Sequence, residues 1–267
     1  MILRRLTEHV RTQNWFAVAL DFFIVVLGVF IGLQVQEWSL ARQEQAQRAS
    51  IIASLMADIQ SDRDEMQSAL DRLQLSVSAA RYVLEEVGEP ASGGTIVSVS
   101  LYTIDIDSGV VPFPPEVPIG DEVRPFLWST LVFSTYPTAA LSAYEALVNT
   151  GKLELIASDA LIRELQTYRQ LWVGLEAAQA GSLRPLRHDA LFTGHKYGLA
   201  PFTETDEQAL LRKVSENPEL RATIQTVMHY NALRYRQISA IDRNAAHLLD
   251  ELGARTPSQT RSPSPNG

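Results

Sequence analysis

The sequence predicts a mainly α-helical protein, in which an N-terminal transmembrane helix continues into a long stalk helix and an extracytoplasmic helical bundle follows, with a short Pro/Gly-rich β/loop insertion. Three observations predict this class: an apolar run from Trp15 to Val35, heptad spacing of apolar residues up to Gly88, and apolar stripes of helical period after Gly120. The expected segments are a cytoplasmic leader (1–14), a transmembrane helix (15–35), a stalk and first bundle helix (36–87), the insertion (88–120), the bundle (121–252) and a disordered tail (253–267).

The composition excludes several classes of function. The 267 residues carry a formal net charge of -8, and this acidity argues against a nucleic-acid partner, which would need a basic face to neutralise phosphates. Cysteine is absent, which excludes disulfides, thiolate zinc sites and a cysteine nucleophile. At 46% hydrophobic residues, the chain has ample apolar material for a core.

The apolar run has the length and flanks of a membrane span. Only Asp21 interrupts it between Trp15 and Leu33, and about 20 apolar residues cross a bilayer core. Trp15 and Trp38 lie 23 positions apart, about 34 Å along a helix, as expected of interfacial anchors. One alternative, a buried core helix, explains the apolar run but not the two tryptophans. The other is a cleaved signal peptide, for which Ser39–Ala41 has small residues suited to a cleavage site. The run is, however, longer than the 7–15 apolar residues usual in a signal peptide. We therefore expect an uncleaved signal anchor in a lipid bilayer.

The distribution of arginines predicts the orientation. The leader carries Arg4, Arg5 and Arg11, whereas Arg42 and Arg48 follow the span. Because positive residues favour the cytoplasmic side, this three-to-two bias places the N-terminus in the cytoplasm. The remaining chain is then periplasmic, and the expected location is a bacterial inner membrane.

One face of the span is a candidate helix–helix interface. Ala17, Asp21, Gly28 and Gly32 are spaced by four, seven and four residues, which places them on one helical stripe. Small residues let a second helix approach closely, and a polar group can bond across the contact, so the stripe indicates a homo-oligomer or docking to another membrane protein. The alternative is that glycine is simply common in membrane helices and that Asp21 reaches the inner interface.

Beyond Trp38 no Gly or Pro occurs before Gly88, and apolar residues repeat every seven positions. Arg63 is the one break in the second of the two heptad series. A coiled coil between chains and packing within one chain both explain the pattern. We favour packing within the chain, because the later helices also carry apolar stripes that need a partner. The two series are Ile52, Ile59, Met66, Leu73, Ala80 and Val87, and Met56, Leu70, Val77 and Leu84.

The rest of the chain contains a β-branched run and several helical patterns. The run Thr95–Ile106 predicts a strand or hairpin. Capping and turn residues predict the helix starts. The predicted helices are 121–134, one from Pro137 to Asn149, one capped by Ser158 with Leu161, Leu165, Tyr168, Trp172 and Leu175 on its stripe, one with a Thr205/Gln208 capping box, and one from Pro218 to about Leu252.

Two stretches carry a family resemblance. The segment DFFIVVLGVFIGLQVQEW with the later SLMADIQSDRDEM, and the segment SAYEALVNTGKLELIASDALIRELQTY, resemble an uncharacterised bacterial single-pass membrane-anchored helical family, a domain of unknown function. The resemblance implies a single-pass anchor with a helical exterior. Ser39 stands where that family usually has Asn, and the family supplies no functional residue to transfer.

The sequence predicts no catalytic, cofactor-binding or metal-binding residue. His188, Asp189, His195 and His229 form a conceivable metal set, but without HExxH or comparable spacing. GxSxG, Walker and GxGxxG motifs are absent. We therefore expect a non-enzymatic periplasmic scaffold or interaction subunit. The alternative is a helical sensor that binds a small ligand and signals through a partner membrane helix. A hydrolase that uses His188 or His195 is the last of the three hypotheses.

Overall fold

A computed structural model describes residues 15–89, 95–98, 109–133, 136–140, 142–151, 153 and 158–255. The chain divides into two units, Met1–Ile51 and Ile52–Gly267. Helix α2 (Trp15–Glu86) is continuous through this division, and most of the described chain is helical, which confirms the mainly α class. The predicted leader and the tail from residue 256 lie outside the described residues. Residues 253–255 were predicted to be disordered, but they belong to the last helix, near whose end Leu252 is buried.

Two short strands fall in the Pro/Gly-rich region. Strand β1 (Thr95–Ser98) pairs antiparallel with β2 (Gly109–Pro112), so that Thr95 lies opposite Pro112. Residues 99–106 of the predicted β-branched run lie outside the described residues. The helices that follow are η1 (Arg124–Phe126), α3 (Leu127–Val132), α4 (Ser142–Thr150), α6 (Asp159–Ala178), the π-helical turn η2 (Gln179–Leu183), α7 (Arg184–Lys196), α8 (Glu207–Glu216) and α9 (Pro218–Arg255).

Local capping groups set several helix ends. Helix α6 begins where predicted, because Ser158 Oγ accepts the Leu161 N–H at 3.5 Å. Helix α8 is capped by Asp206, whose carboxylate accepts the Ala209 N–H at 2.8 Å, so the predicted cap at Thr205 is wrong by one residue. Helix α2 ends before Gly88, whose φ of 78° suits a residue without Cβ.

Helix α4 begins five residues later than predicted. Pro137 does not open it, because carboxylates of α2 hold the preceding segment in a non-helical conformation. Asp62 Oδ1 accepts the Ala140 N–H at 2.6 Å, and Asp58 Oδ2 accepts the Ala143 N–H at 2.8 Å. Asp58 therefore supplies the N-terminal cap from another helix.

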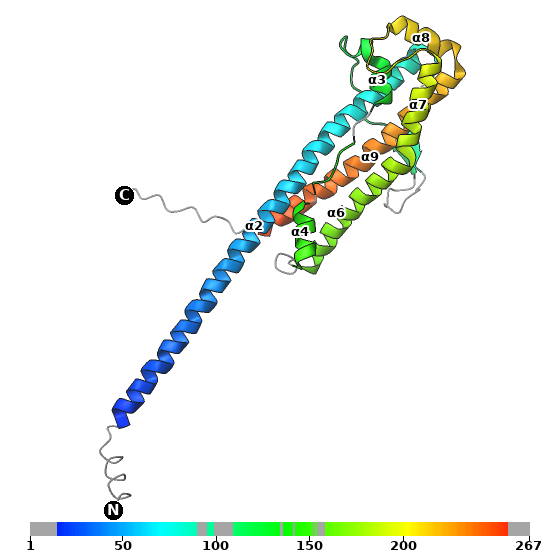
Figure 1. Ribbon diagram of the computed structural model, residues 1–267. Coiled ribbons are helices and arrows are strands. Elements are labelled where there is room, and N and C mark those ends of the chain that lie inside the picture. The colour runs from blue at the N-terminus through cyan, green and yellow to red at the C-terminus, as the bar shows by residue number, and fades with distance from the viewer. Residues whose placement is uncertain are drawn as a thin grey trace, which may run out of the picture. The chain divides into compact units, whose positions relative to one another are not determined.

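Within the second unit, α6, η2 and α7 follow one another end to end alongside α9 (Figure 1). Helix α9 also contacts α3, α8 and β1, and side chains of α2 bond to both α6 and α9. Most residues of the two heptad series are buried inside this single chain, in agreement with the favoured interpretation, whereas Met56 and Val87 are half-buried. The buried ones are Ile52, Ile59, Met66, Leu70, Leu73, Val77, Ala80 and Leu84. Arg63, the break in the series, pairs with Asp242 of α9 at 2.8 Å. The largest fully buried side chains are Trp128, Trp172 and Tyr168.

Candidate functional site

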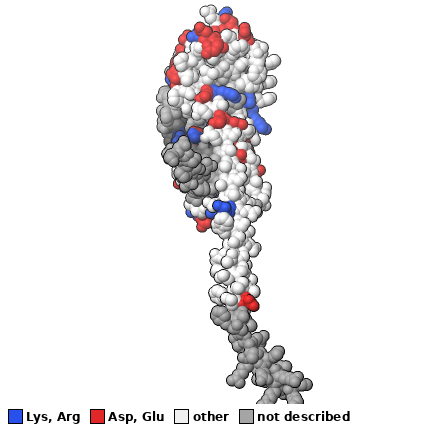
Figure 2. Space-filling view, turned by 90° about the vertical axis from the view of Figure 1, so that its left-hand side faces the viewer, with Lys and Arg blue, Asp and Glu red and all other residues white. Residues whose placement is uncertain are grey.

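The first candidate is the surface of α2 between Leu20 and Leu40. An 18-residue window of this helix reaches a mean hydropathy of 1.7 with none of it buried, so it is long and apolar enough to cross a membrane. Figure 2 shows this stretch as a nearly unbroken white surface. We call it the apolar band. Its large side chains, each 47–71% exposed, are Leu20, Phe22, Phe23, Ile24, Val25, Val26, Leu27, Val29, Phe30, Ile31, Leu33, Val35, Trp38 and Leu40.

The predicted interface residues lie on or next to this band. Asp21 is exposed, and an added Cβ at Gly28 or Gly32 would meet no atom within 4 Å, so nothing in the described chain covers this face of the helix. A second helix could therefore approach the backbone closely there. Trp15 and Ala17 belong to α2, but their side chains lie outside the described residues.

Trp38 ends the apolar band beside a cation. Its side chain is 60% exposed, and the guanidinium carbon of Arg42 lies 4.2 Å from the ring centre. A tryptophan with an arginine one helical turn further on suits the water–lipid boundary, where the ring and the charge each find a favourable environment.

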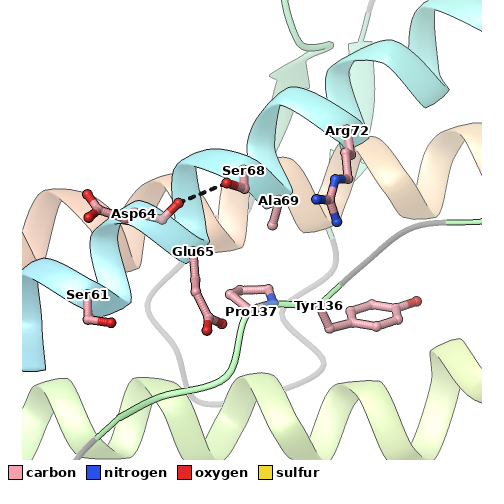
Figure 3. A pocket seen from close by; sticks show the side chains of 8 residues that line it. All are labelled: Ser61, Asp64, Glu65, Ser68, Ala69, Arg72, Tyr136 and Pro137. Atoms are coloured by element: carbon pink, nitrogen blue, oxygen red, sulfur yellow. Dashed lines mark hydrogen bonds between the residues drawn. The ribbon is translucent and has the colours of Figure 1, made fainter.

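The second candidate is a pocket in the unit after Ile52. It has a volume of about 370 Å³ and lies between α2 and the segment 136–140. Figure 3 shows Ser61 and Glu65 toward one end, and Arg72 and Tyr136 toward the other. The Glu65 carboxylate accepts both the backbone N–H and the hydroxyl of Thr138, at 2.9 and 3.1 Å. Two carboxylates, those of Asp64 and Glu65, and one guanidinium, that of Arg72, therefore line the pocket.

A buried acid lies close by on α2 and is fully satisfied. Asp62 is 1% exposed, and its Oδ2 accepts the Tyr168 hydroxyl at 2.7 Å while Oδ1 accepts the Ala140 N–H. Burial raises the pKa of Asp62, opposed by these hydrogen bonds, and burial likewise raises the pKa of Tyr168. Because both carboxylate oxygens have donors, this group holds α2, α6 and the segment before α4 together.

A buried base on α9 is not satisfied in the same way. Arg234 is 2% exposed, and its Nη1 donates to the Leu175 carbonyl at 3.4 Å. Its Nε and Nη2 have no hydrogen-bond partner in the part of the chain that the structure describes. The guanidinium also lies 4.8 Å from the ring centre of Tyr136, and burial lowers the pKa of Arg234 to about 10.

The sequence indicated the apolar band but missed the pocket and Arg234. Arg234 follows Asn231 by three residues and precedes Ile238 by four, so it falls in phase with the buried stripe of α9. A charged residue in that phase was the available signal. The pocket had no such signal, because Ser61–Arg72 and Tyr136 are far apart in the sequence.

The histidines do not gather into a site. His188 and His195 both lie on α7 with exposed side chains, and the His188 Nδ1 is 3.8 Å from the Asp189 carboxylate. His229 lies on α9, where its Nδ1 is 2.6 Å from the Gln225 carbonyl. Among the described residues, no group of three His, Cys, Asp or Glu side chains is placed to hold a metal ion.

Gly194 lies between the two histidines of α7 but does not interrupt the helix. The helix continues through it to Lys196. Gly194 is buried against Trp128, and a Cβ at this position would lie 2.1 Å from the ring carbon Cζ2. The glycine therefore marks a close contact between α7 and α3 and not a helix end.

Comparisons with known proteins add no relative. No protein-family model matches the chain, and neither the curated proteins nor the solved structures give a match. The family resemblance seen in the sequence stays a prediction.

Proposed function

We propose that the protein is a single-pass inner-membrane protein with a cytoplasmic N-terminus and a periplasmic helical unit, which acts as an anchored scaffold or interaction subunit without enzymatic activity. The exposed apolar band of α2 is the observation that carries the proposal. A soluble protein rarely exposes a contiguous apolar surface of this length, since water contact with each side chain is unfavourable. Lipid removes that cost.

The open face at Asp21, Gly28 and Gly32 supports the interaction role. In lipid, helices associate through close backbone contact and interhelical hydrogen bonds, and this face offers both. We propose that a second copy of α2, or the helix of another membrane protein, packs against this face.

Flotation of membranes after carbonate extraction tests the anchor. Full-length protein should float with the membranes, whereas Val25→Arg combined with Phe30→Arg should not, because each arginine near the centre of a span costs about 2.5–3.5 kcal/mol. The matched control, Gln43→Arg with Gln45→Arg, adds the same charge beyond the apolar band and should float as the wild type does. Flotation of the double arginine variant in the band would refute the anchor.

Reporter fusions test the orientation separately. Alkaline phosphatase fused to the C-terminus should be active, because it folds only in an oxidising compartment, and a fluorescent protein exported unfolded at the same position should remain dark. The three-to-two distribution of arginines around the span supports this outcome. The reverse result would place the helical unit in the cytoplasm.

A ligand-binding sensor is the second candidate, and the pocket beside Tyr136 favours it. Its volume of about 370 Å³ falls in the range of small-molecule sites. In this reading, a bound ligand shifts the helical unit and the signal reaches a partner through the membrane helix. Ligand-dependent cross-linking between α2 and a partner helix would support the sensor, and ligand-independent cross-linking would favour the scaffold.

A further inference from the structure

An aromatic side chain is held on the surface between α7 and α8. Phe202 is 72% exposed, and among the described residues it is the one residue other than glycine with a positive φ, at 59°. A bulky residue rarely adopts this left-handed conformation, because its Cβ crowds the backbone. Two contacts hold it there: its N–H donates to the Ser129 hydroxyl at 2.8 Å, and its ring centre lies 4.3 Å from that of Phe133. The fold therefore keeps Phe202 in solvent at a cost in free energy.

Helix α3 extends this apolar surface. Phe126 and Phe133 are seven residues apart at the two ends of α3, so both lie on the face opposite its buried side chains. Phe126 is 39% exposed and Phe133 is half-buried. The loop that carries Phe202 lies along this face, since the Thr205 N–H donates to the Pro125 carbonyl at 2.7 Å. Phe126, Phe133 and Phe202 therefore form one surface, which we call the aromatic patch.

Acidic residues surround the aromatic patch. The segments that carry it, 121–133 and 201–207, contain five carboxylates and one guanidinium, that of Arg124, which is bonded to Glu207 at 3.0 Å. Helix α7 adds a second guanidinium, that of Arg187, whose carbon lies 5.8 Å from the ring centre of Phe133. Figure 2 shows acidic side chains gathered at the end of the second unit where α8 lies. The five carboxylates are those of Asp121, Glu122, Glu204, Asp206 and Glu207.

This combination selects the kind of partner. Aromatic side chains that a partner buries supply much of the binding energy of protein interfaces. Opposite charge around them favours one partner over others, and here the excess of carboxylates favours lysine and arginine. The same excess repels nucleic acid and the head groups of anionic lipids, because both are negatively charged.

We propose that the aromatic patch docks a basic segment of a partner protein, which places an apolar side chain against Phe202 and its lysine or arginine side chains against the surrounding carboxylates. This rests on the interaction role proposed above and gives that role a second surface. It does not depend on the face at Gly28 and Gly32, because all residues of the patch lie in the unit after Ile52.

Photo-cross-linking of the full-length protein in its native cells tests the proposal. Thr203→p-benzoylphenylalanine places a photoreactive group at an exposed position beside Phe202, and mass spectrometry identifies the segment that becomes attached. We expect a segment of another protein that has more lysine and arginine than aspartate and glutamate and at least one large apolar side chain. A segment without net positive charge, a lipid, a second copy of this chain or no cross-link at all would overturn the proposal.

A matched pair of variants tests the aromatic anchor. Phe202→Ala, combined with the photoreactive residue, should lower the yield of this cross-link at least about fivefold, because the partner loses the side chain that it buries. Phe192→Ala removes another phenylalanine of the second unit, 60% exposed on α7 and outside the patch, and should leave the yield unchanged.

A second pair tests the charge. Glu122→Lys with Glu204→Lys should also lower the yield at least about fivefold, because lysines then face the basic segment. The control, Glu176→Lys with Asp250→Lys, makes the same change of charge at exposed positions of α6 and α9 and should not.

Melting temperatures and flotation complete the test. An unchanged yield in Phe202→Ala, or in the charge variant of the patch, would refute the proposal when the variant melts as the wild type does. If Phe202→Ala does not fold, the charge variant decides. Protein that floats with the membranes but gives no cross-link refutes the patch alone, whereas protein that gives the cross-link but does not float refutes the anchor alone.

Discussion

Substitution of Gly194 by alanine tests how α7 packs on α3. An alanine Cβ would lie 2.1 Å from Cζ2 and 2.6 Å from Cε2 of Trp128. Nonbonded carbon atoms rest about 3.5–4.0 Å apart, so the indole or the helix must move by more than about 1 Å. Trp128 is 1% exposed and packed among other core residues, which leaves no empty space for that movement.

The expected loss of stability follows from two opposing terms. Overpacking of a filled core costs about 1–3 kcal/mol, and an overlap this deep with a rigid ring belongs near the upper value. Alanine in place of glycine inside a helix returns about 1 kcal/mol. The net loss is about 2 kcal/mol, which for a unit of this size lowers the melting temperature by about 4–8 °C.

Thermal unfolding of the full-length protein in detergent measures this shift. Gly181→Ala is the matched control, because its added Cβ meets no atom within 4 Å. The control should melt at the wild-type temperature or slightly above it. A Gly194→Ala variant as stable as the control would show that Trp128 does not pack against α7 as described.

Two further predictions concern the membrane helix and a buried acid. The double variant Gly28→Ile, Gly32→Ile should abolish helix association in a bilayer reporter assay. The control variant Val26→Ile, Phe30→Ile changes the opposite face of the helix and should still associate. Equal association of the two double variants would contradict the interface. Burial raises the pKa of Asp62 above 3.8, so its proton stabilises the folded state below pH 3.8, and this contribution is lost as the pH rises through the folded pKa. Denaturant titrations measure the free energy of unfolding of the wild type and of Asp62→Asn at each pH. The difference between them, wild type minus variant, should fall as the pH rises. A difference that does not depend on pH would contradict the burial of this acid.

Features that depend on neighbouring residues could be predicted from the sequence. The starts of α6 and α9 follow from Ser158 and Pro218, because a cap acts on amides one turn away and proline fits the first helical turn. The apolar band was equally accessible, since length and composition alone define a candidate span. The burial of the α2 stripe followed from its seven-residue period and from the need of the later helices for a partner.

Features that depend on distant residues could not be predicted. The late start of α4 arises because Asp58 and Asp62, about 80 residues earlier, bind its leading amides, and no local pattern shows this. Gly194 resembles a helix breaker in the sequence, yet α7 passes through it because only glycine leaves room for Trp128. In both cases tertiary contacts override the local preference.

The two buried charges show what the helical period of a sequence can and cannot predict. Asp62 and Arg234 each fall in phase with a buried stripe, so the sequence can predict that both are buried, but the phase of a residue does not give its partner. The structure separates them: Asp62 has a donor on each oxygen, whereas Arg234 has two nitrogens without an acceptor in the described chain. A buried charge with every bond made can be explained by the fold alone. One with bonds unmade lowers the stability of the fold.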